Sequence, residues 1–387
     1  MARIYLDHAA TTPMVPEAIE AMTRELGRTG NASSLHASGR AARKVVEEAR
    51  ESIAAHVAAH PTELIFTSGG TEADNLAVKG GYWSQAARRR TEVVASAVEH
   101  HAVLDSVAWL EEAAGATVHW LPVDPTGRVR EADLDATIGP RTALVSVMWG
   151  NNEVGTLQPV SAVVARAAEH GALSHSDAVQ AVGHVPVDFA ASGLDLLSFT
   201  AHKLGGPYGV GALLARRTLN LTAHQHGGGQ ERDVRSGTLD VAAVAGFAAA
   251  VDVAMRGLEQ ERTKVRALRE LLVAAVTESA PDAVVLGPRA PDDRLPGVVS
   301  VLFPGCSAEA LLMLLDAAGL DCATGSACSA GVAQPSHVLL AMGLDETAAR
   351  SVLRFSLAGR NDVRDVMALR DALPDVVDRA RAAAAYA

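Results

Sequence analysis

Short apolar runs alternate with helix-like stretches through the first two-thirds of the chain. Each run stops abruptly at polar residues, which is typical of buried strands. Most of the runs are followed by a stretch that is compatible with a helix, and such alternation favours a mostly parallel sheet covered by helices. The predicted strands are residues 63–67, 92–96, 142–147, 172–177 and 196–200.

The pattern changes after about residue 255. The elements predicted there are an amphipathic helix rich in Arg and Glu at residues 258–277, a strand at 297–303, and helices at 308–318 and 345–351. They indicate a second, smaller α/β domain. We therefore expect a large domain over residues 16–255 and a small domain formed by residues 1–15 and 256–387.

Composition is compatible with this division. The 387 residues, 49% of them hydrophobic, are enough to bury the cores of one large and one smaller domain. No apolar stretch reaches the roughly 18 residues of a membrane span, and the alanine-rich run from Ala242 to Ala250 is typical of a buried helix. The first residues lack the apolar region of a signal peptide. A cytoplasmic protein without membrane contact is predicted.

Charge and cysteine content narrow the possible functions. The net charge is −11 and no basic stripe stands out, so direct binding of nucleic acid is not expected. The three cysteines are Cys306, Cys322 and Cys328. An odd, sparse set argues against a disulfide framework and fits a reducing cytoplasm. Only His337 is close to them in sequence, so no metal site is expected.

The strand predicted at residues 196–200 carries the strongest chemical signal. Its apolar run stops at Thr200, His202 and Lys203, and the glycine-rich turn Gly205-Gly206-Pro207 follows. Open α/β sheets bind ligands at the carboxyl ends of their strands. A lysine held there suits Schiff-base chemistry with a carbonyl cofactor. The alternative for this stretch alone is a surface lysine in a loop.

Other strand ends supply groups that fit the same chemistry. Gly69-Gly70-Thr71, at a predicted helix start, offers N–H groups and a hydroxyl to a phosphate, and Thr200 and His202 would add donors. Asp177 would keep a pyridinium nitrogen protonated, and His100 would lie over a planar ring. Taken singly, each has an ordinary interpretation as a helix cap, a buried histidine or a turn. Together they favour a pyridoxal phosphate site.

Motifs spread over nearly the whole chain point to one family. The main ones are residues 5–13 (YLDHAATTP), 31–36 (NASSLH), 67–75 (TSGGTEADN), 151–155 (NNEVG), 227–232 (GGGQER), 235–239 (RSGTL), 325–328 (GSAC) and 354–357 (RFSL). They resemble cysteine desulfurases of the NifS/IscS family, which are fold-type I pyridoxal phosphate enzymes. The resemblance implies an α/β fold with a mostly parallel, seven-stranded sheet in a large domain, plus a smaller α/β domain.

The resemblance also implies the central catalytic residues. Lys203 would bind pyridoxal phosphate as a Schiff base, and His100 would stack on its ring and transfer protons. Arg354 would bind the carboxylate of the substrate, L-cysteine, with Asn152 beside it. Cys328 would accept the sulfur as a persulfide, whereas Cys322 and Cys306 are not expected to react.

Further cofactor contacts follow from the same resemblance. Asp177 would pair with the ring nitrogen, and Gln180 and Asn152 would lie near the phenolic oxygen. The implied phosphate ligands are Gly70, Thr71, Thr200, His202 and, from a neighbouring subunit, Thr238. A site shared in this way predicts a homodimer.

The implied reaction is conversion of L-cysteine to L-alanine, with transfer of the sulfur to an acceptor protein that the sequence does not identify. Iron–sulfur cluster assembly, transfer-RNA thiolation, DNA phosphorothioation and thio-cofactor synthesis all remain open. A selenocysteine lyase or another class V aminotransferase-like enzyme is the alternative, although an aminotransferase has no use for Cys328. A scaffold subunit without activity would require the loss of a catalytic group. The family pattern is altered at His8, Ala32, Trp149 and Ala201.

Overall fold

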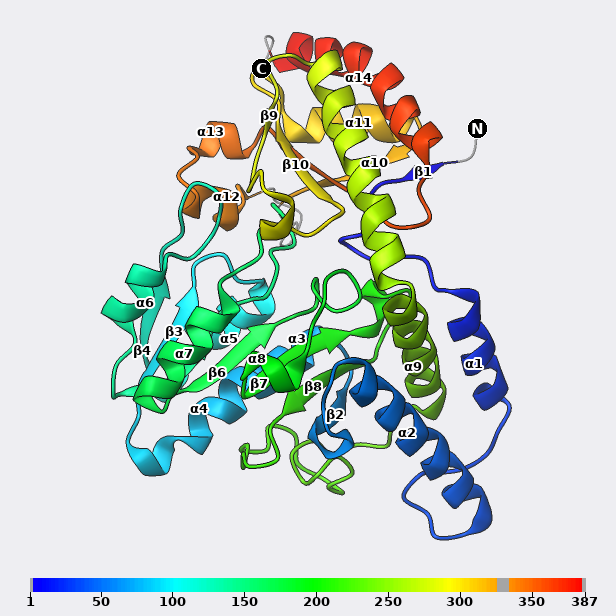
Figure 1. Cartoon of the computed structure of the whole chain (residues 1–387), viewed down its shortest axis with the longest axis vertical. Helices are drawn as coiled ribbons and strands as arrows, with labels where there is room; N and C mark the ends of the chain where they lie inside the picture. The colour runs from blue at the N-terminus through cyan, green and yellow to red at the C-terminus, as the bar shows by residue number, and fades with distance from the viewer. Residues whose placement is uncertain (1–2, 326–333, 385–387) are drawn as a thin grey trace.

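The computed structural model describes residues 3–325 and 334–384. Its largest sheet has seven strands and lies in the lower part of the molecule in Figure 1. In spatial order, the strands are β2 (Leu64–Thr67), β8 (Gly211–Ala215), β7 (Leu196–Thr200), β6 (Leu173–Asp177), β5 (Thr142–Ser146), β3 (Glu92–Ser96) and β4 (Thr117–Leu121). Only β8 runs antiparallel to its neighbours. The predicted mostly parallel sheet is confirmed.

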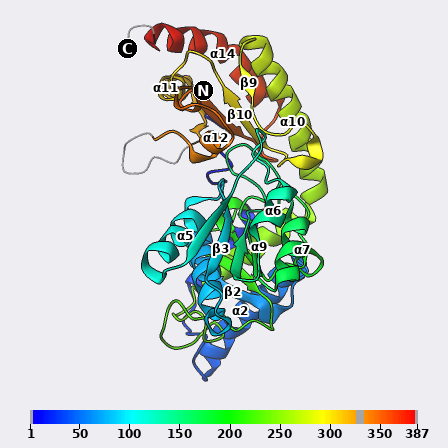
Figure 2. The ribbon, with the colours of Figure 1, turned by 90° about the vertical axis from the view of Figure 1, so that its left-hand side faces the viewer.

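Helices cover both faces of this sheet. One face is packed by α3 (Gly70–Asn75), α4 (Gly81–Ser84) and α5 (His101–Ala114), and the other by α1 (Pro16–Leu26), α2 (Ala37–His56), α6 (Glu131–Thr137), α7 (Val160–His170) and α9 (Val241–Arg256). Side chains alternate across a strand. Accordingly, Val93 and Ala95 of β3 face the α5 side, and Val94 faces the α7 side. Figure 2 shows β3 between these two layers.

A smaller antiparallel sheet lies above the first one in Figure 1. Its order is β12 (Ala323–Thr324), β13 (Val352–Ser356), β10 (Val298–Leu302) and β9 (Val284–Val285). It is covered by α10 (Leu258–Ser279), α11 (Ala308–Ala317) and α14 (Val363–Ala384). Leu353 and Phe355 point into this core, so Arg354, between them, faces the opposite side.

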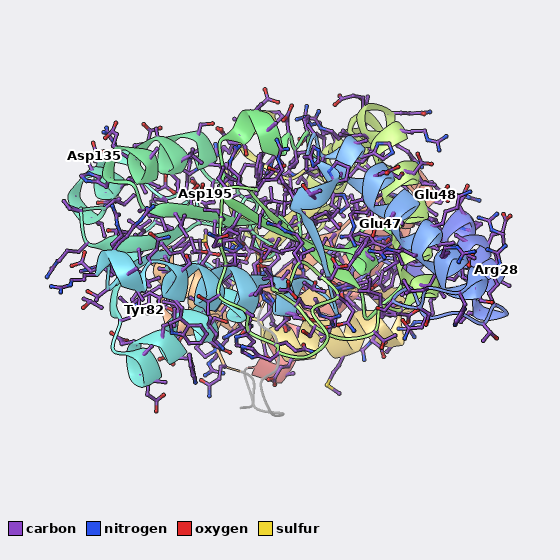
Figure 3. The ribbon with its side chains drawn as sticks, turned by 90° about the horizontal axis from the view of Figure 1, so that it is seen from below. Arg28, Glu47, Glu48, Tyr82, Asp135 and Asp195 are labelled. Carbon is purple, nitrogen blue, oxygen red and sulfur yellow. The ribbon has the colours of Figure 1, made fainter. Side chains whose placement is uncertain are left out.

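The chain passes from one sheet to the other near both ends of the sequence. β1 (Ile4–Tyr5) pairs with β11 (Leu320–Asp321) beside the small sheet. Further along, the Thr12 N–H donates to the His202 carbonyl (3.2 Å) and the Val15 N–H to the Gly205 carbonyl (2.8 Å). The segment 4–15 therefore connects the small sheet to the turn that carries Lys203. Figure 3 views the same molecule from below, with Arg28 and Asp135 at opposite ends.

The elements predicted after residue 255 are confirmed in position as α10, β10 and α11. The helix predicted at residues 345–351 corresponds to the shorter α13 (Glu346–Ala349), and α12 (His337–Ala341) precedes it. Division into domains at the predicted boundaries stays a prediction.

α9 and α10 meet at a bend of 69° and together reach the length and apolar composition of a membrane span, which no single helix in the described ranges does.

The core beneath β7 gives a test of the packing. Phe247 of α9 is fully buried, and its ring lies 5.5 Å from that of Phe199. We expect Phe247→Ala to lower the free energy of unfolding by about 3–5 kcal/mol, because it leaves a cavity in the core. Urea denaturation at a fixed protein concentration measures this. Met313→Ala, at a position that is 73% exposed, is the control, with a change within about 0.5 kcal/mol. Equal stability of the two variants would contradict the packing described.

Candidate active site

The carboxyl ends of five strands meet at one cavity of about 690 Å³. These strands are β2, β3, β5, β6 and β7, and the cavity is closed on the other side by β13 and the N-terminal segment. The predicted site residues that line it are Gly70, Thr71, His100, Asn152, Asp177, Gln180, Thr200, His202, Lys203 and Arg354. Thr238 is exposed and does not line this cavity. Cys328 lies outside the described residues.

Lys203 ends the short turn that follows β7. Its Nζ donates to the carbonyl oxygens of Ala9 (2.6 Å) and Ala10 (2.8 Å). Burial, followed by the positive charge of Arg354, lowers the pKa of Lys203 to about 8, and Asp177 and Asp7 oppose this shift. The amine is therefore partly neutral in mildly alkaline solution, and a neutral amine is the form that attacks a carbonyl.

Asp177 is the last residue of β6, and its Oδ1 accepts a hydrogen bond from the Val179 N–H (2.8 Å). Burial raises the pKa of Asp177, and the neighbouring groups His100 and Lys203 oppose that rise. A cation placed against this carboxyl group would further favour its ionised form. Asp177 can therefore pair with a protonated ring nitrogen.

His100 lies at the N-terminus of α5 and caps it. Its Nδ1 accepts from the Ala102 N–H (3.1 Å), so the hydrogen of the neutral ring is on Nε2. Burial lowers the pKa of His100, which keeps the imidazole neutral at pH 7. A neutral ring with one free N–H suits both stacking and proton transfer.

The end of the cavity near β2 and β7 is rich in donors. Thr71 and Thr200 bring hydroxyl groups, and His202 brings an imidazole whose pKa burial lowers to about 4. The backbone lies close to its neighbours there, because a Cβ on Gly70 would come within 2.9 Å of Val179 Cγ2. Such a cradle of hydroxyl and N–H groups is suited to a phosphate.

Arg354 reaches the cavity from β13 and is 6% exposed. Its Nη1 donates to the Asn152 carbonyl (3.0 Å) and its Nη2 to Asp7 Oδ1 (2.7 Å). The Nε–H is buried and has no partner among the described residues. A guanidinium in this position can bind a carboxylate.

Sequence reasoning missed several carboxyl groups that line the same cavity, namely Asp7, Asp74, Glu99 and Glu153. Asp74 and Glu99 are buried, and one oxygen of each lacks a partner in the described part of the chain. Burial raises the pKa of both well above the ordinary value, which favours their protonated forms. Burial also raises the pKa of Glu153 to about 7. Nothing in the sequence distinguishes these residues from other acidic residues after a strand.

Two of the three cysteines lie in the described residues, and both are buried. Cys322 lines the cavity, and burial raises its pKa to about 12. Burial also raises the pKa of Cys306, whose Sγ faces the Val377 carbonyl. Neither thiol is ionised near pH 7, and the thiolate is the reactive form.

Comparison with known proteins agrees with this geometry. The class V aminotransferase family model matches residues 4–369. The chain is 54% identical over 384 residues to an IscS-like cysteine desulfurase of Mycobacterium tuberculosis (strain ATCC 25618 / H37Rv), and the match covers 98% of each chain. The chain belongs to the NifS/IscS family of cysteine desulfurases. This family depends on pyridoxal phosphate and has the α/β architecture described above.

Solved structures support the same assignment. A NifS-like protein matches with a TM-score of 0.90 and 33% identity, over 97% of this chain and 100% of that one. SspA in complex with cysteine matches with a TM-score of 0.79 and 30% identity, over 92% and 99% of the two chains. The resemblance in sequence motifs is thus confirmed.

The residues of the cavity fit pyridoxal phosphate on three counts. Lys203 offers an amine to the aldehyde, and Asp177 offers a carboxyl group to the ring nitrogen. Thr71 and His202 could donate to the phosphate, whereas Thr200 Oγ1 donates to the Val210 carbonyl (3.1 Å) in this structure. These groups come from separate strand ends that open into one cavity, so a single ligand can contact all of them.

The lowered pKa of Lys203 predicts how the cofactor-free protein reacts with acylating reagents. We expect the labelling of Lys203 by trace acetic anhydride to be half-maximal at about pH 8. Below that pH the buried amine is protonated and unreactive, and above it the amine is neutral. Mass spectrometry across a pH series measures the midpoint. A midpoint near 10.4, the usual value for lysine, would contradict the environment described.

Proposed function

We propose that this chain converts L-cysteine to L-alanine, with Lys203 and Asp177 binding the cofactor and Arg354 binding the substrate. The observation that carries the proposal is the convergence of these three side chains on one cavity. One relative is named a cysteine desulfurase and one similar structure is SspA in complex with cysteine, which favours cysteine as the substrate. The alternatives of a selenocysteine lyase or another class V aminotransferase-like enzyme are not favoured.

Bound pyridoxal phosphate would supply an aldehyde that condenses with amines and a ring that draws electrons away from the α-carbon. Lys203 would carry it, and Asp177 would favour protonation of its ring nitrogen. Gly70, Thr71, Thr200 and His202 would hold the phosphate, and Gln180 and Asn152 would lie near the phenolic oxygen. His100 would stack on the ring.

The remaining steps need a base, a carboxylate receptor and a proton carrier. With its pKa near 8, Lys203 can accept the α-proton of the substrate as a neutral amine. Arg354 would hold the substrate carboxylate and so fix the orientation of the α-carbon. The neutral His100 can exchange a proton through Nε2.

Sulfur capture is proposed for Cys328. Its thiolate attacks the substrate sulfur, an S–S bond forms and the Cβ–S bond breaks. The carbon keeps the electron pair of the broken bond and takes up a proton, which yields alanine and a persulfide. Cys322 and Cys306 are unsuited to this role because burial raises the pKa of both thiols. The persulfide sulfur would then pass to an acceptor protein.

Selective loss of sulfur transfer tests this assignment. We expect Cys328→Ser to bind pyridoxal phosphate with the wild-type absorbance spectrum but to form no persulfide, since a hydroxyl group cannot hold the sulfur. The matched controls Cys306→Ser and Cys322→Ser should retain most of the sulfide release and alanine formation. Mass spectrometry after a pulse of L-cysteine locates the persulfide. A persulfide on Cys322 or Cys306, with Cys328 unmodified, would overturn the assignment.

The proposed enzyme is a cytoplasmic homodimer in which Thr238 contacts the cofactor phosphate of the neighbouring subunit. What supports the shared site is that Thr238 is exposed and stands away from the cavity of its own subunit. Thr238 follows a loop whose Glu231 forms a buried ion pair with Arg50 of α2 (2.7 Å) and accepts from the Phe66 N–H of β2 (2.9 Å). It could therefore be presented to a partner in a defined position.

Mixing two impaired variants under limiting pyridoxal phosphate tests the shared site. We expect Lys203→Ala to be inactive and Thr238→Ala to be weakened when pyridoxal phosphate is limiting. Denaturing and refolding them together should restore roughly a quarter of the wild-type activity, because half of the random dimers are mixed and each has one intact site. Sulfide release measures the recovery. If every site used its own Thr238, mixing would restore nothing.

A further inference from the structure

The guanidinium of Arg354 is held by a carboxylate from the opposite end of the sequence. Asp7 Oδ1 accepts from Arg354 Nη2 at 2.7 Å, across 347 positions of the chain. The side chains of Asp7 and Arg354 are 18% and 7% exposed, and both line the cavity that contains Lys203. The pair is therefore part of the site, whereas the family motif alone gave Asp7 no role.

The backbone fixes Asp7 against the strand that carries Arg354. Asp7 forms a parallel bridge with Ser356 of β13. On either side of it, the Leu6 carbonyl accepts from the Ser356 N–H (2.7 Å), and the His8 N–H donates to the Ser356 carbonyl (3.3 Å). Because Arg354 and Ser356 are two positions apart on β13, they lie on the same face of the strand. The backbone at Asp7 is therefore fixed against β13, and the Asp7 carboxylate contacts the guanidinium directly.

Both terminal nitrogens of the Arg354 guanidinium already form one hydrogen bond each. Nη2 is bonded to Asp7, and Nη1 donates to the Asn152 carbonyl (3.0 Å). Nε is buried and has no partner within the described ranges. Each Nη carries a second N–H, and a carboxylate accepts strong hydrogen bonds from such groups.

We propose that Asp7 is a positioning residue for substrate binding: it clamps Arg354 through Nη2 and so holds the guanidinium at the cavity in one orientation for the substrate carboxylate. The inference rests on the proposed function, because it takes the carboxylate to be that of cysteine. It assigns to Asp7 an action through Arg354 and no contact with the reacting atoms.

The same carboxylate also balances the charge near Lys203. Arg354 lowers the pKa of Lys203, and Asp7, along with Asp177, raises it. Loss of the Asp7 charge would leave the guanidinium less opposed, and the pKa of Lys203 would fall below about 8. Asp7→Asn removes this charge but keeps the size of the side chain, so it tests the charge separately from the backbone of the segment, whose Ala9 and Ala10 carbonyls accept from Lys203 Nζ.

The first experiment compares Asp7→Ala with Asp7→Asn. We expect Asp7→Ala to raise KM for L-cysteine about ten- to a hundredfold, the usual worth of a hydrogen bond to a charged group, with a smaller change in kcat. Asp7→Asn keeps an acceptor oxygen and should raise KM less. In an Arg354→Ala background, Asp7→Ala should add little, because the two residues act as a unit. Asp321→Asn is the control. Asp321 is an acidic residue of β11, which pairs with β1, and it does not line the cavity.

The second measurement uses the cofactor-free protein. The labelling midpoint of Lys203 should fall below about pH 8 in Asp7→Asn and stay at about 8 in Asp321→Asn. This readout does not need catalysis and remains available if Asp7→Ala fails to fold.

Four results would overturn the inference. A lower KM in Asp7→Ala would mean that Asp7 occupies the place of the substrate carboxylate and competes with it. An unchanged KM, or an equal effect of Asp7→Ala with and without Arg354, would also exclude positioning. An unshifted Lys203 midpoint in Asp7→Asn would exclude the charge balance. Failure of the proposed function is distinct, since the wild-type protein would then form no alanine from cysteine.

Discussion

The site depends on the cost of burying the amine of Lys203. An ammonium group taken out of water must find acceptors, and here it finds the carbonyl oxygens of Ala9 and Ala10. Those carbonyls belong to a segment that is bonded to β13 at one end and to the turn after β7 at the other. Hydrogen bonds thus connect the Lys203 amine, both sheets and the N-terminal segment. Burial also lowers the pKa of Lys203 to about 8, so part of the amine is neutral near physiological pH.

The cavity concentrates acidic groups that lie in different environments. Burial raises the pKa of Asp74 and Glu99 well above the ordinary value, and one oxygen of each has no partner in the described residues. Asp7 is paired with Arg354, and Asp177 faces His100 and Lys203. A protonated acid adds no like charge beside Asp177, so the raised pKa of Asp74 and Glu99 favours the pairing of Asp177 with a cation. Residues of one chemical type therefore contribute in different ways.

Sequence reasoning predicted the strand ends well because each buried run stops at chemically distinctive residues. It located β2, β3, β5, β6 and β7 and the side chains that follow them. It missed β4, whose outer residues are partly exposed, and β8. It also missed the pairing of Asp7 with Arg354, because residues so far apart in sequence meet only through the topology of the small sheet. Thr238 and Cys328 stay predictions for another reason: the first is proposed to act in a neighbouring subunit, and the second lies outside the described residues.

The N-terminal segment has a consequence for how the protein is made. Residues 4–9 are synthesised long before their partners on β11 and β13, which are separated from them by more than 300 positions. At about 5–20 residues per second, the segment waits for tens of seconds before its partners exist. The large sheet can form in the meantime, since its strands end at residue 215. The pocket around Lys203 is therefore among the last parts of a newly made chain to close, and a cofactor can enter an open half-site during synthesis.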